Sequence, residues 1–182
     1  KANKADLEKA KKEHPLFTIF QPNQSGQGCM LGYALAKDTA QINKYFAMPE
    51  VINQLPRELR LKWGVKPAEF DPSGKIFELY AIKSTSRDGR APLEGDVITD
   101  ARDEFDQNNQ QVVGMTMNSE GAREWAQLTK QNVGHCIAIV LDGFVYSAPN
   151  VNNEITGGRS SISGHFTPEE AKDLANVLKS GK

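Results

Sequence analysis

Apolar and polar residues alternate most regularly in the second half of the chain, where a short strand and an amphipathic helix are predicted. In VVGMTMN (residues 112–118), Val113, Met115 and Met117 share one side, which is the two-residue period of a half-buried strand. In SEGAREWAQLTKQN (119–132), one largely apolar side of a helix is predicted from the spacing i, i+3, i+6 and i+7 of Ala122, Trp125, Leu128 and Thr129. The spacing therefore predicts a strand followed by a helix.

Three more strands and a final helix are predicted downstream. CIAIVL (136–141) and FVYSA (144–148) flank Asp142-Gly143, a dipeptide that favours a type I′ hairpin turn because both residues tolerate positive φ. SSISGHF (160–166) gives one more short strand. The last helix has Thr167 as N-cap, Pro168 in its first turn and Glu170 completing a capping box, and Gly181 is its predicted stop. This element order is typical of an α+β fold of ferredoxin-like type, with helices on one face of an antiparallel sheet.

The first half predicts a smaller mixed α/β unit. ADLEKAKKE (5–13) indicates a charged helix, and LFTIF (16–20) a short strand. Asp38 and Gln41 match a capping box for a helix that would bury Ile42, Tyr45 and Phe46. A second short helix is expected to begin at Pro49 and to end at Pro56. LRLKW (59–63) and KIFELYAI (75–82) are predicted to be neighbouring strands joined through the turn sequence DPSG (71–74).

The segment between the halves, STSRDGRAPLEGD (84–96), is polar, contains Gly and Pro, and has no periodicity. Such composition is typical of a domain boundary or a hinge, although an ordinary surface loop has the same composition. We predict two domains, residues 1–92 and residues 93–182.

Composition narrows the class of protein. Of the 182 residues, 38% are hydrophobic and 25% charged, which is enough for a packed core. The net charge of −1 argues against a dedicated nucleic-acid binder, which would carry a basic face. No apolar run approaches the ~20 residues of a membrane-spanning helix. The chain opens on a charged tract without Met and closes on a capped helix, so we expect it to be a piece of a longer protein.

The candidate reactive residues do not form a recognisable catalytic or metal site. His135 and Cys136 are adjacent on a predicted strand and would point to opposite faces, so they cannot form a dyad. His165, just before the last helix, is expected to be a packing or surface residue, and Cys29 and Cys136 to be buried thiols. The acidic run DARDEFDQNN (100–109) departs from a calcium loop and is interpreted as a solvated helix face. We therefore expect no enzyme activity, no metal and no cofactor.

An ordered series of short motifs in the second half carries a family resemblance. These are LDG with Ser-Ala-Pro between Leu141 and Pro149, the turn Gly157-Gly158-Arg159, ISG-x-F at 162–166, and the helix EEA-x-x-LA-x-x-L that precedes Gly181. From about residue 95 onward the chain resembles the first periplasmic domain (P1) of the SecD and SecDF family, accessory subunits of the bacterial Sec protein-export machine. The first ninety residues resemble it only weakly.

The resemblance implies a two-part domain, with a ferredoxin-like base (93–182) and a smaller head (1–92). It implies that the domain lies on the periplasmic, extracytoplasmic side of the cell membrane and belongs to a multi-pass membrane protein. The implied function is to bind emerging unfolded preprotein and to aid translocation driven by the proton gradient. The implied partners are that preprotein, the Sec channel and a SecF-type subunit, with no nucleic acid. The proton-carrying residues of the family lie in membrane helices outside this sequence.

A surface that holds any passing chain should offer adaptable apolar contacts. The head candidates for preprotein contact are Met30, Leu31, Tyr33, Tyr45, Phe46 and Met48, although the same residues could form the head core. The candidate hinge residues are Gly89, Pro92 and Gly95. The alternative function is a stand-alone ferredoxin-like module that binds or senses a ligand.

Overall fold

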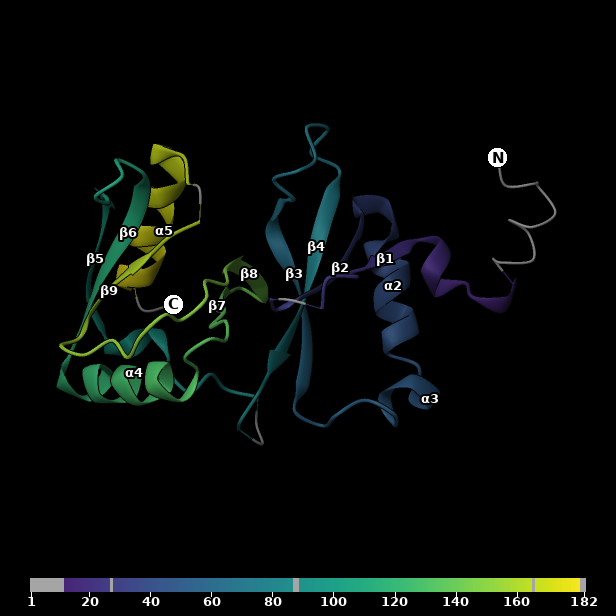
Figure 1. Ribbon diagram of the computed structural model, residues 1–182, viewed down its shortest axis with the longest axis horizontal. Helices are drawn as coiled ribbons and strands as arrows, with labels where there is room; N and C mark the ends of the chain where they lie inside the picture. The colour runs from purple at the N-terminus through teal and green to yellow at the C-terminus, as the bar shows by residue number, and fades with distance from the viewer. Residues whose placement is uncertain (1–11, 27, 87–88, 165, 181–182) are drawn as a thin grey trace. The chain divides into compact units, whose positions relative to one another are not determined.

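A computed structural model describes residues 12–26, 28–86, 89–164 and 166–180 and shows a mixed α+β fold (Figure 1). The chain divides into two units, Lys1–Lys83 and Ser84–Lys182, whereas the sequence predicted the division at residues 92/93. The charged helix predicted at 5–13 falls almost entirely outside the described residues, as do His165 and Gly181. Among the residues described, no helix combines the length and the apolar character needed to cross a membrane.

The first unit contains an antiparallel sheet with the strand order β1–β2–β4–β3. Its strands are β1 Phe20–Pro22, β2 Met30–Leu35, β3 Leu59–Pro67 and β4 Ile76–Lys83. β3 and β4 are neighbours, as their alternating patterns predicted, with Trp63 opposite Leu79. The predicted turn between them is also present, because the amide of Gly74 donates to the carbonyl of Asp71 over 3.1 Å and Gly74 has a φ of 65°.

The helical segments of the first unit differ from the prediction at three places. They are the 3₁₀ turns η1 Leu16–Thr18 and η2 Ala36–Asp38, and the helices α2 Thr39–Phe46 and α3 Pro49–Ile52. LFTIF is not a strand, since its first three residues form η1 and only Phe20 enters β1. Asp38 does not cap α2 with its side chain, because η2 already gives its backbone helical dihedral angles. Pro49 does occupy the first turn of α3, but the helix predicted to end at Pro56 already ends at Ile52.

The core of the first unit lies between α2 and one face of the sheet. Ile42 of α2 is completely buried against a cluster that includes Phe20, Ala34, Trp63 and Leu79. Along β4 and from Gly32 onward in β2, every second side chain thus points to this core and the others to the opposite face. A register shift between Met30 and Gly32 interrupts the alternation, so that Leu31 packs on the core while Met30 and Tyr33 share the opposite face.

The second unit contains a three-stranded antiparallel sheet and a separate two-stranded hairpin. The sheet has the order β5–β6–β9, with β5 Ile98–Phe105, β6 Gln111–Met117 and β9 Arg159–Ile162. The hairpin consists of β7 Ile139–Leu141 and β8 Phe144–Ser147. Its turn residues Asp142 and Gly143 have φ values of 49° and 85°, as a type I′ turn requires.

The interpretation of the acidic run as a helix face is wrong. Residues 98–105 form β5, and the run ends in a tight turn where Asp106 accepts hydrogen bonds from the amides of Asn108 and Gln110, both over 2.8 Å. The helical interpretation failed because β5 has few apolar residues, and only Ala101 is fully buried. The α+β class is confirmed. The ferredoxin-like order is not reproduced in detail, because β5 precedes the first predicted strand and the β7–β8 hairpin lies outside the β5–β6–β9 sheet.

Two helices pack on the same face of the β5–β6–β9 sheet. α4 Ser119–Gln131 and α5 Pro168–Ser180 share one core with the sheet, and α5 runs alongside β5 and β6 (Figure 1). Thr167 and Glu170 form the predicted capping box, with the Thr167 amide 2.8 Å from the Glu170 carboxylate. α4 is capped by Asn118, whose side chain accepts from the amide of Gly121 over 2.8 Å.

Candidate functional site

The six residues that the sequence proposed for polypeptide contact do not form one surface. Leu31 and Phe46 pack against the core of the first unit, which is the structural role that the sequence analysis left open. Tyr45 is half-buried on α2, and Met48 precedes α3 with 44% of its surface exposed. The remaining two, Met30 and Tyr33, lie on the sheet face that points away from the core.

That outer face carries an aromatic cluster, which we call the aromatic face and define as Met30, Tyr33, Phe70 and Tyr80. Met30 pairs with Tyr80 across β2 and β4, so their side chains share one side of the sheet. The ring of Tyr33 contacts Phe70 edge-on, with 5.1 Å between the ring centroids. Phe70 is 55% exposed, and the other three side chains are half-buried. The cluster therefore offers apolar surface to a molecule in solution.

Phe70 is positioned by the turn that follows it. The Asp71 carboxylate accepts hydrogen bonds from the Ser73 hydroxyl (2.7 Å) and from the amides of Ser73 (3.0 Å), Lys75 (2.7 Å) and Ile76 (2.8 Å). The hydrogen bond from the Ser73 hydroxyl, together with those from the amides, lowers the pKa of Asp71 from 3.8 to about 2 despite some opposing desolvation. Asp71 is thus ionised under ordinary conditions and fixes the turn next to Phe70.

A short hydrogen bond holds the Tyr80 side chain in place. Its hydroxyl donates to the Glu78 carboxylate over 2.6 Å. Burial raises the pKa of Tyr80, and the neighbouring Glu78 raises it further by hydrogen bonding and by its negative charge. Tyr80 therefore remains a neutral aromatic side chain, suited to packing rather than to proton transfer.

The sequence analysis missed Phe70 and Tyr80, although a signal for Tyr80 was present. Because β2 and β4 are neighbours with alternating faces, the residues of β4 that alternate with Leu79 share the face of Tyr33. Phe70 lies in the β3–β4 connection. The packing of a loop residue cannot be predicted from the periodicity of strands or helices.

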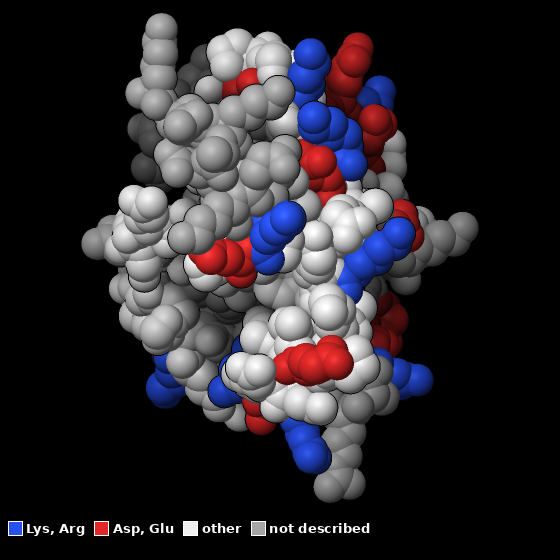
Figure 2. Space-filling model, turned by 90° about the vertical axis from the view of Figure 1, so that its right-hand side faces the viewer, with Lys and Arg blue, Asp and Glu red and all other residues white. Residues whose placement is uncertain are grey.

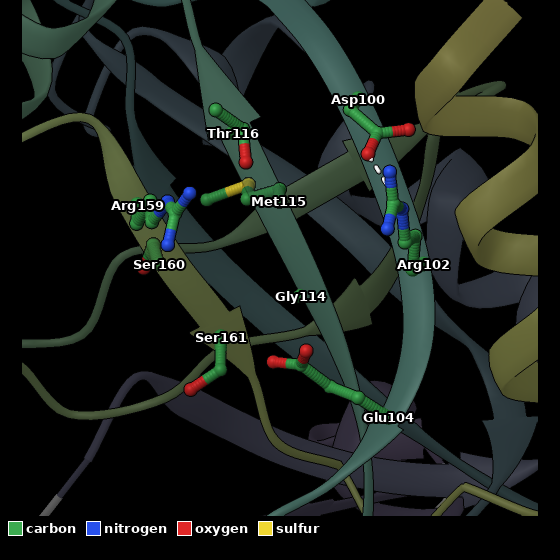
Figure 3. A pocket seen from close by; sticks show the side chains of 9 residues that line it. All are labelled: Asp100, Arg102, Glu104, Gly114, Met115, Thr116, Arg159, Ser160 and Ser161. Carbon is green, nitrogen blue, oxygen red and sulfur yellow. Dashed lines mark ion pairs between the residues drawn. The ribbon is translucent and has the colours of Figure 1, made fainter.

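A second candidate surface is a polar hollow of about 470 Å³ on the outer face of the β5–β6–β9 sheet (Figure 3). Asp100, Arg102 and Glu104 of β5 line one side of the hollow, and Arg159 and Ser161 of β9 line the other. Glu104 points over β6 towards Ser161, whereas Asp100 and Arg102 pair with each other on the β5 side (Figure 3). Gly114 of β6 lies beneath the Glu104 side chain. A β-carbon there would lie 2.5 Å from Oε1 of Glu104, whose carboxylate covers this position.

The charges of this hollow largely neutralise one another. Asp100 pairs with Arg102 (2.7 Å) and with Lys179 of α5 (3.4 Å). Partial burial raises the pKa of Asp100, but the hydrogen bond with Lys179 and the charge of Arg102 outweigh it, so the pKa lies below the usual value. Two carboxylates and two guanidinium groups suit contact with mixed polar chains better than selective binding of an anion.

The three candidate hinge residues occupy two different environments. Gly89, with a φ of 79°, and Pro92 are exposed. Gly95 opens the 3₁₀ turn η3 Gly95–Val97, and Val97 is buried, with its carbonyl accepting from the amide of Asn118 over 2.9 Å. Gly95 is therefore anchored within the second unit.

The cysteines and His135, which were considered for catalysis, lie in ordinary environments. Cys29 and Cys136 are half-buried rather than buried, and the Cys136 thiol donates to the side-chain oxygen of Asn150 over 3.2 Å. His135 is exposed. Across the described ranges, no three His, Cys, Asp or Glu side chains gather as metal ligands would. On the face shown in Figure 2, basic and acidic side chains are interspersed, which is unlike the basic stripe of a nucleic-acid binder.

Comparison with known proteins identifies the family. Residues 78–182 match the family model described as the SecDF P1 head subdomain. The chain is 48% identical over 168 residues to protein translocase subunit SecD of Rhodothermus marinus, covering 92% of this chain and 26% of that protein. It is 33% identical over 157 residues to SecD of Magnetococcus marinus, covering 86% of this chain and 27% of that protein.

A solved structure of SecDF, a membrane component that enhances protein export, is 30% identical and covers 100% of this chain and 71% of the solved chain, with a TM-score of 0.47. The chain spans about a quarter of the length of the SecD proteins from Rhodothermus marinus and Magnetococcus marinus. The match to the head subdomain covers the whole second unit and the end of β4, whereas the resemblance placed the head at 1–92. We therefore refer to the units by number. The chain belongs to the SecD/SecDF family of protein translocase subunits, within its P1 domain.

Proposed function

We propose that this chain is a non-catalytic binding module that contacts unfolded preprotein during export by the Sec translocase. Its family membership supports this proposal, as does the description of one SecDF relative as a membrane component that enhances protein export. The parent protein would work with the Sec channel and a SecF-type subunit, and this chain would lie on the periplasmic side of the membrane. Proton-driven coupling would be supplied by parts of the parent protein outside this sequence.

The aromatic face is the observation that carries the proposal. Aromatic rings and a thioether provide contact area that does not depend on one partner geometry, because Met adapts its shape and ring faces accept many side chains. Phe70 is 55% exposed, and its ring contacts that of Tyr33 edge-on. Such a surface suits weak binding to many sequences, which a subunit that handles different exported chains requires.

The segment that joins the units would serve as a hinge. Gly89 and Pro92 are exposed and precede Leu93, which packs against the core of the second unit. Motion of the first unit relative to the second would then be absorbed by residues 84–92.

The test is fluorescence anisotropy with a labelled polypeptide kept unfolded by reduction and alkylation, compared with the same polypeptide in its native fold. We expect saturable binding of the unfolded form only. Replacing both Tyr33 and Phe70 by Ser should weaken it about tenfold, the equivalent of about 1.4 kcal/mol.

The matched control is Phe17→Ser, since Phe17 is 56% exposed in the same unit but lies in η1. Equal weakening by the control, or no binding of the unfolded polypeptide, would refute the proposal. Saturable binding of one small metabolite in place of polypeptide would favour the alternative, a ferredoxin-like regulatory module.

A further inference from the structure

Strand β9 has one edge without a strand partner in the described part of the second unit. β9 pairs with β6 on one side, with Ser161 opposite Gly114. The amide of Met117 donates to the carbonyl of Gly158 over 2.8 Å, which marks Gly158 as a hydrogen-bonded position. Since such positions alternate in an antiparallel ladder, the backbone groups of Arg159, Ser161 and Ser163 point away from β6. The Ser163 carbonyl does point away from β6, because it accepts a hydrogen bond from the Ser147 hydroxyl over 2.6 Å.

A cavity of about 300 Å³ lies beside this edge. Residues 160–163 form one wall and residues 149–153 the other, while Met115, Trp125, Ile137, Ile139 and Ile155 supply apolar surface. The opposite wall is held by Thr129, whose buried hydroxyl accepts from the amide of Ile155 over 2.9 Å. Every residue that lines the cavity is neutral. A charged ligand would lose its hydration there without gaining a counter-ion, so the occupant is neutral.

The cavity is also lined by the indole of Trp125, for which the described residues supply no hydrogen-bond partner. Trp125 is 8% exposed, and the described residues supply no acceptor for its Nε1. The other tryptophan, Trp63, is equally buried and donates to the side-chain oxygen of Asn43 over 2.9 Å. Buried polar groups are normally paired, so a partner for Trp125 is expected from outside the described chain. A carbonyl oxygen is the acceptor that every polypeptide carries.

We propose that β9 receives one extended segment of polypeptide as an added strand, with one neutral side chain of that segment in the cavity and a carbonyl oxygen on the indole of Trp125. The inference rests on the proposed function and names a binding site for it in the second unit. β9 has four residues, so only a few main-chain hydrogen bonds form and the segment is released easily. Main-chain pairing is independent of sequence, and the neutral cavity selects against charged side chains.

The probe is an end-blocked octapeptide of alternating leucine and serine, titrated into the ¹⁵N-labelled chain and followed by NMR. We expect the indole N–H resonance of Trp125 to move downfield and to exchange more slowly with solvent. The Trp63 resonance serves as an internal control and should stay in place, because its N–H is already paired.

Two substitutions and one altered peptide test the edge. Ser161→Pro removes an outward amide without touching the β9–β6 ladder and should weaken peptide binding about tenfold, whereas Ser161→Ala keeps the amide and should bind as the wild type does. The same peptide, methylated on alternate amide nitrogens, should bind the wild-type protein about as weakly as the unmethylated peptide binds the proline variant. Because the protein is unchanged in this experiment, misfolding of the proline variant cannot be the cause of the weaker binding. Trp125→Phe should weaken binding severalfold.

The outcomes separate this site from the proposed function. Binding of unfolded polypeptide that Ser161→Pro, Trp125→Phe and N-methylation all leave unchanged would overturn the β9 site and leave the aromatic face standing. Absence of any polypeptide binding would overturn both. Movement of the Trp125 resonance on dilution of the chain without peptide would show that a second copy occupies the edge, and would also overturn the proposal.

Discussion

Gly158, immediately before β9, lies directly against Ala122 of α4. A β-carbon on Gly158 would lie 2.8 Å from the Cβ of Ala122, and Gly158 has a φ of 69°. Two separate constraints therefore require glycine here, the backbone conformation and the close approach of the helix. The contact fixes where β9 enters the sheet and so places the wall of the cavity that Trp125 lines.

Replacing Gly158 by Ala should destabilise the chain more than replacing Gly157 by Ala. Gly157 also has a positive φ, of 86°, but a β-carbon there would meet no atom within 4 Å. The Gly157 variant should cost about 1–2 kcal/mol for the backbone conformation alone, and the Gly158 variant about 1–3 kcal/mol more for the crowding. Urea unfolding measures both. Equal losses would show that α4 does not restrict this position.

The hydrogen bond between Trp63 and Asn43 should contribute to the stability of the first unit. The indole is 8% exposed and donates to the Asn43 side chain over 2.9 Å. Asn43→Ala leaves this donor unpaired and should cost about 1–3 kcal/mol. In a Trp63→Phe background the same substitution should cost less than about 0.5 kcal/mol, because no donor remains. A double-mutant cycle by chemical denaturation checks the difference, and additive losses would contradict it.

Acid should weaken the turn beside Phe70. The pKa of Asp71 is lowered from 3.8 in the ordinary range to about 2 in the fold. A carboxyl with a depressed folded-state pKa adds stability that is present above about pH 4 and is lost as the pH falls towards about pH 2. Asp71→Asn should therefore lower Tm at neutral pH, and its difference from the wild type should shrink across that window.

Thermal unfolding between about pH 6 and pH 2 measures this effect. Glu69→Gln, two residues earlier, is the control for the loss of one carboxylate and should show no comparable narrowing. A constant difference between Asp71→Asn and the wild type would contradict the assignment.

The sequence predicted most elements whose signals are local. The alternation of β3 and β4, the Asp142-Gly143 turn and the Thr167 capping box depend on neighbouring residues, and the structure confirms all three. The prediction for the acidic run failed because β5 is an edge strand with an exposed polar face, so its sequence shows almost no alternation of apolar and polar residues. The predicted capping of α2 by Asp38 failed because a 3₁₀ turn precedes this helix, and the capping motif in the sequence does not indicate that turn.

The candidate sites could be predicted less well from the sequence. The alternation of β2 could separate Tyr33 from its core neighbour Ala34, but the contact between Tyr33 and Phe70 joins residues far apart in the chain. The cavity beside β9 lies between segments that are separated in the chain. The indole that finds no partner among the described residues belongs to a helix whose pattern indicates only core packing. Such features arise from tertiary arrangement, which a period along the chain does not encode.

Fixing the two units to each other should stop export by the full-length parent protein. One cysteine is introduced in each unit after Cys29 and Cys136 are replaced by Ser, and a thiol-specific crosslinker joins them. We expect export to fail when the units are joined and to persist with each single cysteine. Binding of unfolded polypeptide to the crosslinked chain should be retained, which separates loss of motion from loss of the binding surface. Normal export by the joined protein would reject the hinge at residues 84–92.

The most direct measurement is photocrosslinking from the aromatic face of the full-length protein in membrane vesicles during export. A photoreactive phenylalanine analogue replaces Phe70 in one protein and the equally exposed Phe17 in another. The account predicts that the exported polypeptide is crosslinked from position 70 while it is still unfolded, and much less from position 17. Equal labelling from both positions, or none from position 70 during active export, would contradict it.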